Sequence, residues 1–376
     1  MESTEDKRIK KFATTLIERN NIEKGDRVYL LAKSLEALPL FEEVRRQLFL
    51  LGAHPQEHLL YDCQNGYDAM DHDYLKYSSE EDLQKSSRIR MNEMEEVDAY
   101  IRIGGETNHQ ELSDIDPEKI SMVKEANREI KMERFRKKWI ATRFPTSGFA
   151  QRAGMSTQEM ENFIFRAVNA TDWDRMKKKN SAIKKRFDRG EKVRILSEDT
   201  DIEFSIEGRE GINSHGRRNM PDGEVYYAPR KYSVEGEINF TYTGVLNGQE
   251  VEDVSLEFED GKIVEFDCRT NREFLESMIN SDEGSRYLGE FGIGTNPYIQ
   301  RFVKSTMLDE KIAGSIHLAV GNAYEMTVDE GERNDSAIHW DLIKDLRDKK
   351  DGGKIILDGE TVQEDGEWLF DVPELN

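Results

Sequence analysis

Cysteine and long apolar runs are both scarce in this chain of 376 residues. Its two cysteines, Cys63 and Cys268, lie far apart, and nothing in their spacing suggests a disulfide framework, so a reducing compartment is expected. The charged stretch at residues 1–11 lacks the apolar core of a signal peptide, and no later run approaches membrane-spanning length. We therefore expect a cytoplasmic protein with no membrane partner.

Positive charge is also in deficit. The chain has 54 lysines and arginines against 76 aspartates and glutamates, which gives a formal net charge of -22. Such a surface repels the phosphates of nucleic acids and anionic lipids, so neither is an expected partner. Hydrophobic residues still make up 36% of the chain, enough for a sizeable core, and the length suits two domains of ordinary size.

The first half of the chain alternates strand and helix patterns. An apolar run predicts a buried strand over residues 27–32, and helical spacing follows over residues 38–51. Residues 97–103 predict a second strand, and Ser156 with Glu159 predicts a capping box at the start of another helix. Strands that alternate with helices predict an N-terminal α/β domain with a mostly parallel sheet.

The second half consists mainly of short alternating segments that predict strands. We therefore divide the chain into an N-terminal domain at residues 1–185 and a C-terminal domain at residues 186–376, with a linker near residues 180–190. The C-terminal domain is expected to be β-rich and barrel-like with flanking helices, so the fold class of the whole chain is α/β plus α+β.

Five of the seven histidines lie in polar or loop-like segments without the spacing of metal ligands: His54, His58, His72, His109 and His215. We expect no metal at these positions, and only His215 is a candidate for contact with a substrate. The other two lie in strand-like segments. A lone histidine in an apolar run, such as His317 in SIHLAVG, is more often a hydrogen-bonded core residue than a ligand.

His339 and Asp341 are two residues apart in SAIHWDL. In an extended segment, residues two apart point to the same face, so the imidazole and the carboxylate can reach one metal site. Such a pair is weak on its own, because many His-x-Asp sequences are surface accidents. The prediction therefore depends on what other ligands the chain offers.

Two glutamates stand in unusual surroundings. Glu224 follows a Pro-Asp-Gly turn, and glycines flank Glu290 in LGEFGIG, as occurs where backbone must approach a ligand closely. Taken singly, each is more typical of a solvated surface residue. Two or three carboxylates with two histidines can hold two divalent cations. A water between the cations can then attack a polarised carbonyl, and one cation can anchor a free amino group.

Four segments in this order resemble the thermophilic-type metalloaminopeptidases, the family of aminopeptidases T and S: NMPDGEVYYAP, YLGEFGIGTNP, MLDEKIAGSIHLAVGNAY and SAIHWDL. They span Asn219 to Leu342, and the first half agrees more loosely, including RFPTSGFAQRAGMS at residues 143–156. The resemblance covers most of the chain. It implies a metal-dependent aminopeptidase that removes the N-terminal residue of a peptide by means of a metal-activated water.

The resemblance also implies the metal ligands, which are Glu224, Glu290, His317, Tyr324, His339 and Asp341. Only the resemblance makes Tyr324 a ligand, since a tyrosine in this context would otherwise be a half-buried packing residue. Either of the two glutamates can also shuttle a proton, so Glu224 and Glu290 are the candidate catalytic carboxylates. The implied cofactors are two divalent ions (zinc, cobalt or magnesium), the substrates are peptides with a free N-terminus, and the assembly is a homodimer.

Two other functions remain open at this point. A family of ring-cleaving dioxygenases that open dihydroxypyridine resembles the same fold and keeps a His-x-Asp pair at a single iron, but this chemistry would leave Glu224 and Glu290 unused. A catalytically dead homologue that only binds peptides is the other alternative. The six competent ligand positions argue against it.

Overall fold

The computed structural model describes residues 6–60, 71–246, 248–328, 330–347 and 352–375. Cys268 is a half-buried free thiol, and Cys63 lies outside the described residues. In the part of the chain that the structure describes, no helix has the length and apolarity needed to cross a membrane.

The chain forms two compact units. Unit 1 comprises Met1–Ala170 with Gly216–Pro221, and unit 2 comprises Thr171–His215 with Asp222–Asn376. This division differs from the one expected near residue 185. The expected linker lies largely within α10 (Trp173–Phe187), whose apolar face is buried and which packs against strands of unit 2, so the helix belongs to that unit.

Unit 1 is built on a five-stranded sheet in the order β2-β1-β3-β4-β8, and every pair in it is parallel. Its strands are β1 (Arg27–Ala32), β2 (His54–Leu59), β3 (Ala99–Gly104), β4 (Lys138–Arg143) and β8 (Asn219–Met220). The mostly parallel sheet expected from the sequence is confirmed. The fifth strand comes from a distant part of the chain, which local patterns could not show.

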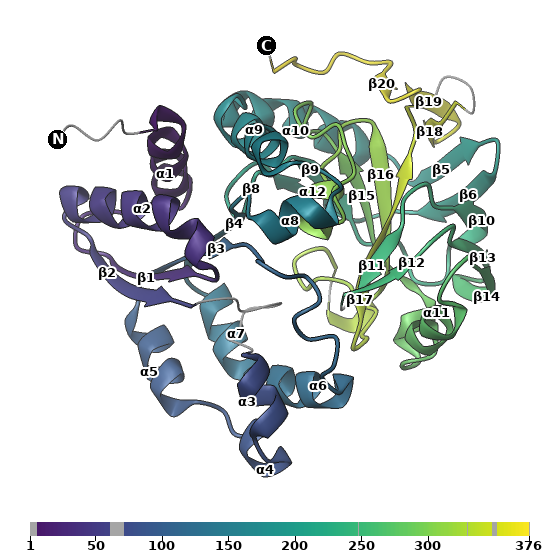
Figure 1. Cartoon of the computed structure of the whole chain (residues 1–376). Helices are drawn as coiled ribbons and strands as arrows, with labels where there is room; N and C mark the ends of the chain where they lie inside the picture. The colour runs from purple at the N-terminus through teal and green to yellow at the C-terminus, as the bar shows by residue number, and fades with distance from the viewer. Residues whose placement is uncertain (1–5, 61–70, 247, 329, 348–351, 376) are drawn as a thin grey trace. The chain divides into compact units, whose positions relative to one another are not determined.

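The helices of unit 1 connect and flank these strands (Figure 1). They are α1 (Lys7–Arg19), η1 (Leu35–Ala37), α2 (Leu38–Leu51), α3 (His72–Tyr77), α4 (Glu80–Leu83), α5 (Arg88–Glu96), α6 (Pro117–Ala126), α7 (Arg128–Phe135), α8 (Ser147–Arg152) and α9 (Thr157–Asn169). The predicted capping box is present at the start of α9, where Ser156 and Glu159 each accept a backbone N–H of the other.

Unit 2 contains two large antiparallel sheets and one small one. The eight-stranded sheet has the order β14-β13-β10-β6-β5-β18-β19-β20, the five-stranded sheet has the order β17-β16-β15-β9-β7, and β11 pairs with β12. The strands of the eight-stranded sheet are β5 (Lys192–Ser197), β6 (Thr200–Ser205), β10 (Glu235–Asn239), β13 (Ser255–Glu259), β14 (Lys262–Asp267), β18 (Lys354–Leu357), β19 (Glu360–Glu364) and β20 (Glu367–Trp368).

The five-stranded sheet contains β7 (Ile212–Ser214), β9 (Glu224–Tyr227), β15 (Leu288–Gly294), β16 (Ser315–Gly321) and β17 (His339–Asp345). The remaining elements are β11 (Gly244–Leu246), β12 (Gln249–Val251), α11 (Arg272–Ile279), η2 (Gly284–Arg286), α12 (Thr306–Asp309) and η3 (Glu330–Glu332), beside α10. The unit expected to be β-rich and barrel-like thus consists of antiparallel sheets with a few helices (Figure 1).

One apolar core joins the two large sheets of unit 2. Phe204 of β6 meets Phe291 of β15 edge to face, with ring centroids 5.0 Å apart, so the sheets contact each other through their buried faces. All residues of β15 and β16 are buried. A polar side chain on these strands therefore lies where water is excluded and needs a specific partner.

Candidate metal centre

The five-stranded sheet of unit 2 carries the acidic and imidazole groups expected from the sequence. Glu224 is the first residue of β9, and Glu290 lies on the neighbouring strand β15. His317 follows on β16, opposite Gly292, and β17 carries His339 and Asp341. Four adjacent antiparallel strands therefore bring together residues that are more than a hundred positions apart in the sequence.

Alternation along β17 orients His339 and Asp341 as predicted. His339 and Asp341 both offer ligand atoms to one group with Glu290. Trp340 between them is almost fully buried in the apolar core, where its ring packs against Phe274 of α11. The period of two residues thus places the imidazole and the carboxylate on the face opposite the core.

Glu290 lies between the two imidazoles. Its Oε1 is 3.0 Å from Nε2 of His317, and its Oε2 is 3.9 Å from Nε2 of His339. Nε2 of His317 is also 3.7 Å from Oε2 of Glu224, and Nε2 of His339 is 3.5 Å from Oδ1 of Asp341. The cluster therefore contains two groups that share Glu290, and in each group the candidate ligand atoms lie within 4.8 Å of one another.

Glu310 belongs to the same cluster, and the sequence reasoning missed it. It follows α12 and forms a third group with His317 and Asp341, again with ligand atoms within 4.8 Å of one another. Burial raises the pKa of its carboxyl group. The only sequence feature that could have indicated Glu310 was its position in MLDEKIAG, seven residues before His317. An acidic residue in a polar turn is ordinarily solvated, so the local sequence did not single it out.

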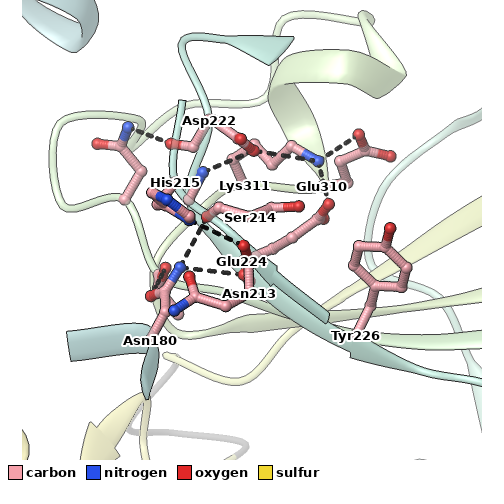
Figure 2. Close-up of polar contacts among 12 residues, drawn as sticks. Asn180, Asn213, Ser214, His215, Asp222, Glu224, Tyr226, Glu310 and Lys311 are labelled. Carbon is pink, nitrogen blue, oxygen red and sulfur yellow. Dashed lines mark hydrogen bonds and ion pairs between the residues drawn. The ribbon is translucent and has the colours of Figure 1, made fainter. Parts of the chain in front are cut away.

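The neighbouring Lys311 supplies a buried positive charge (Figure 2). Its Nζ lies 2.5 Å from Oε1 of Glu224 and 2.6 Å from Oε1 of Glu310. Oδ1 of Asp222 is 3.8 Å away. The sequence reasoning did not consider this lysine either, because a lysine beside a glutamate in a turn is typical of a protein surface.

Several atoms of the cluster are buried without a hydrogen-bond partner among the described residues: Oε2 of Glu224, Oε2 of Glu290, Nδ1 of His317 and Oδ1 of Asp341. A buried polar atom left without a partner costs about 1–3 kcal/mol, and more when it is charged. Carboxylate oxygens and imidazole nitrogens are ligands that divalent cations accept. The donor set therefore fits a divalent metal centre, and bound cations would satisfy these oxygens.

The electrostatic environment of the cluster is strongly perturbed. Burial raises the pKa of Glu224 to about 8. Burial opposes the charged form of His317, but its hydrogen bond to Glu290 and the nearby Glu224 outweigh that effect and raise its pKa to about 9. Burial likewise opposes the charged form of His339, yet Asp341 raises its pKa to about 10. Buried carboxylates thus favour positive charge here, whether from protons or from metal ions.

Tyr324 lies beside this cluster rather than inside it. Its side chain is 43% exposed, and its ring centroid is 4.6 Å from that of His339 and 6.2 Å from that of Tyr226. This places the tyrosine at the solvent side of His339. A role for its hydroxyl as a metal ligand stays a prediction.

Three of the histidines not expected to bind metal make contacts elsewhere. His58 stacks on Tyr29 with ring centroids 4.0 Å apart, and Nε2 of His72 is 2.9 Å from Oδ1 of Asp114. Both contacts lie in unit 1. Nδ1 of His215 is 2.9 Å from the carbonyl oxygen of Asn213 in unit 2, and the residue is drawn in Figure 2.

Comparisons with known proteins agree with a metal centre. A family model described as thermophilic metalloprotease (M29) matches residues 5–368. Aminopeptidase AmpS of Bacillus subtilis (strain 168) is 31% identical over a segment that covers 43% of this chain and 44% of that protein. Aminopeptidase 2 of Geobacillus stearothermophilus is 24% identical, and the match covers 94% of this chain and 95% of that protein.

Two solved structures resemble the chain over nearly its full length. Wild-type AmpT from Thermus thermophilus has a TM-score of 0.80 at 22% identity, and the match covers 97% of this chain and 99% of that one. The 2,5-dihydroxypyridine dioxygenase from Pseudomonas putida KT2440 has a TM-score of 0.60 at 14% identity, with 98% of each chain covered. At these identities the likenesses show the fold alone.

Gly292→Ala is expected to disrupt the metal centre. A Cβ at this position would lie 2.0 Å from Nε2 of His317, so the imidazole has to leave its present position, in which Nε2 is 3.0 Å from Oε1 of Glu290. We expect at least a tenfold loss of metal affinity, measured by competition with a chelator. Gly331→Ala is the control, because nothing lies within 4 Å of the Cβ it would add. Metal affinity equal to wild type in Gly292→Ala would contradict this placement of His317.

The metal-free protein is expected to lose stability as the pH rises. Raised pKa values of about 9 for His317 and about 10 for His339 mean that their stabilising contribution is complete below their ordinary value of 6.5 and disappears as pH rises through the folded-state values. Glu224, with its pKa raised to about 8, acts in the same direction.

Urea denaturation after metal removal measures this effect. The free energy of unfolding should fall between about pH 6.5 and about pH 10, and saturating metal should reduce the fall, because cations replace the bound protons. A metal-free protein whose stability is constant or increases over this range would show that the imidazoles do not share protons with the carboxylates as described.

Proposed function

The chain belongs to the thermophilic metalloprotease (M29) family and is a metal-dependent peptidase, and from this premise we propose that it is an aminopeptidase that hydrolyses the N-terminal residue from peptides. The observation that carries the proposal is the buried cluster in which Glu290 lies between His317 and His339. The names of the relatives AmpS and Aminopeptidase 2 support the same activity.

We propose that two divalent ions occupy the centre. Glu224, Glu290 and His317 would hold one ion, and Glu290, His339 and Asp341 would hold the other, because these are two of the groups whose ligand atoms lie within 4.8 Å. Glu290 belongs to both groups. Tyr324 is a further candidate ligand beside His339. Zinc, cobalt and magnesium each suit some of these nitrogen and oxygen donors.

Divalent ions at such a centre lower the pKa of water and polarise a carbonyl group, which is the chemistry that hydrolysis of a peptide bond requires. The side chains supply the rest. Glu224 and Glu290 are the proposed catalytic carboxylates that accept and return a proton, since both line the cluster and are less than a tenth exposed. The surplus of carboxylates also suits the free α-amino group of a peptide.

The competing dioxygenase function is not favoured. A mononuclear iron centre uses two histidines and one carboxylate, whereas this cluster holds Glu224, Glu290, Glu310 and Asp341 around its two imidazoles. The structural likeness to the dioxygenase is a likeness of fold alone. The family match, by contrast, is to metalloproteases. A catalytically dead homologue that only binds peptides is also disfavoured, since every residue of the two candidate ligand groups is a residue type that can bind metal.

We further propose that the enzyme acts in the cytoplasm as a homodimer. The resemblance to the aminopeptidases T and S supports the homodimer, and the cysteine-poor composition supports a reducing compartment such as the cytoplasm. Sedimentation of the metal-loaded protein tests the assembly, and a monomer at all protein concentrations would exclude it.

Peptides with a free N-terminus should be degraded, and their N-acetylated counterparts should resist cleavage. An aminopeptidase recognises the α-amino group, either through a cation of the centre or through an acidic side chain. Chromatography of the products from matched free and blocked peptides measures the difference. Release of internal fragments, or equal turnover of both peptides, would exclude an exopeptidase that acts at the N-terminus.

The wild-type protein should bind two divalent ions per chain, and His339→Ala should bind one tightly. Loss of a ligand should exceed the 10- to 100-fold decrease in affinity that follows loss of a group supporting a ligand. Trp340→Phe is the matched control because the indole lies in the core on the opposite face of β17. Elemental analysis after dialysis gives the counts. A plateau at one ion in the wild type, with iron preferred, would favour the dioxygenase instead.

A further inference from the structure

Lys311 is the residue of the cluster whose purpose the proposed function does not explain. It follows Glu310 at the end of α12, and its side chain is fully buried. Removing an ammonium group from water is strongly unfavourable unless acidic partners compensate for the lost hydration. A buried lysine is therefore expected to form ion pairs with the acidic side chains around it and to influence their positions.

Three carboxylates surround the ammonium group of Lys311 (Figure 2). Oε1 of Glu224 and Oε1 of Glu310 lie within hydrogen-bond distance of its Nζ, at 2.5 Å and 2.6 Å, and Oδ1 of Asp222 lies at 3.8 Å. Glu224 begins β9, whereas Glu310 follows α12. The lysine therefore connects two acidic residues that come from separate segments of unit 2.

The two oxygens of Glu224 have different surroundings. Oε1 accepts a hydrogen bond from the ammonium group of Lys311. Oε2 has no hydrogen-bond partner among the described residues and lies 3.7 Å from Nε2 of His317. One oxygen is thus fixed by the lysine, and the other is left to face the centre. A carboxylate held in this way leaves Oε2, which has no hydrogen-bond partner among the described residues, as the oxygen available to a cation.

The net charge of the cluster gives a second reason for a lysine at this place. Five carboxylates gather here: Asp222, Glu224, Glu290, Glu310 and Asp341. Two divalent ions would bring four positive charges, and Lys311 brings the fifth, so the loaded centre is neutral when both imidazoles are neutral. The lysine supplies a charge that the ions would leave uncompensated, next to Glu224 and Glu310.

We propose that Lys311 is a positioning residue of the metal centre, whose ammonium group restrains Glu224 and Glu310 by one oxygen each so that they present the other oxygen to the cations. This proposal rests on the proposed function only in requiring that the centre binds divalent metal. It concerns how the ligands are held, and it applies whatever peptide the enzyme cleaves.

Lys311→Met tests the proposal, because methionine has nearly the same length and no charge or donor. Zn²⁺ affinity is measured by competition with a chelator, without any peptide. We expect affinity to fall about 10- to 100-fold, as it does when a group that orients a metal ligand is removed. Excess Zn²⁺ should restore part of the peptidase activity. Lys311→Gln, whose amide can donate one hydrogen bond, should lie between the wild type and Lys311→Met.

Lys344→Met is the matched control. Lys344 also belongs to unit 2, its side chain is 7% exposed, and it pairs with Asp199 at 2.5 Å, but it is in none of the groups that could hold a metal. Its loss should lower the thermal stability of the metal-free protein and leave Zn²⁺ affinity unchanged. If Lys311→Met behaves in the same way, Lys311 is only a structural counter-ion and the proposal is wrong.

Two further outcomes decide the matter. Tighter Zn²⁺ binding in Lys311→Met would also overturn the proposal, since the ammonium group would then oppose the cations rather than hold their ligands. If Lys311→Met does not fold, Lys311→Gln decides alone, and wild-type affinity in that variant counts against a positioning role. A wild-type protein that binds metal but cleaves no peptide would refute the aminopeptidase function and leave this test intact.

Discussion

The candidate centre depends on one constraint, which is that the negative charge of carboxylates buried on one face of a sheet must be compensated. Glu224, Glu290 and Asp341 are each no more than 9% exposed, and repulsion among buried carboxylates is not screened by water as it is at a surface. The protein compensates with Lys311 and with imidazoles that hold protons readily. In the metal-free protein these groups provide the positive charge, and bound divalent ions would supply most of it in their place.

The same constraint explains why the candidate ligands lie on neighbouring strands rather than on loops. Strands β9, β15, β16 and β17 are hydrogen-bonded to one another, so their register fixes the distances between side chains. Gly292 shows how tightly this is arranged, because the space that a Cβ would need is filled by the ring of His317. A rigid sheet with an apolar core behind it can keep like charges close together without relaxing away from them.

Much of the local structure followed from the sequence. The strand at Arg27–Ala32, the helix at Leu38–Leu51 and the capping box at Ser156 are formed where local patterns predicted them. Other features were not foreseen because their cause is not local. The helix Trp173–Phe187 joins unit 2 through its buried face, and Asn219–Met220 becomes the fifth strand of the unit 1 sheet through its pairing with β4.

For the candidate centre, the sequence by itself determined that His339 and Asp341 share a face, because the two-residue period of a strand is a local property. Four ordered segments that resemble a known family indicated which other residues belong with them. Only the tertiary structure decided that Glu290 lies between the two imidazoles, and that Glu310 and Lys311 complete the cluster. Strand pairing and the packing of α12 decide those contacts, and a chain's local pattern does not specify which distant segment a buried charge will meet.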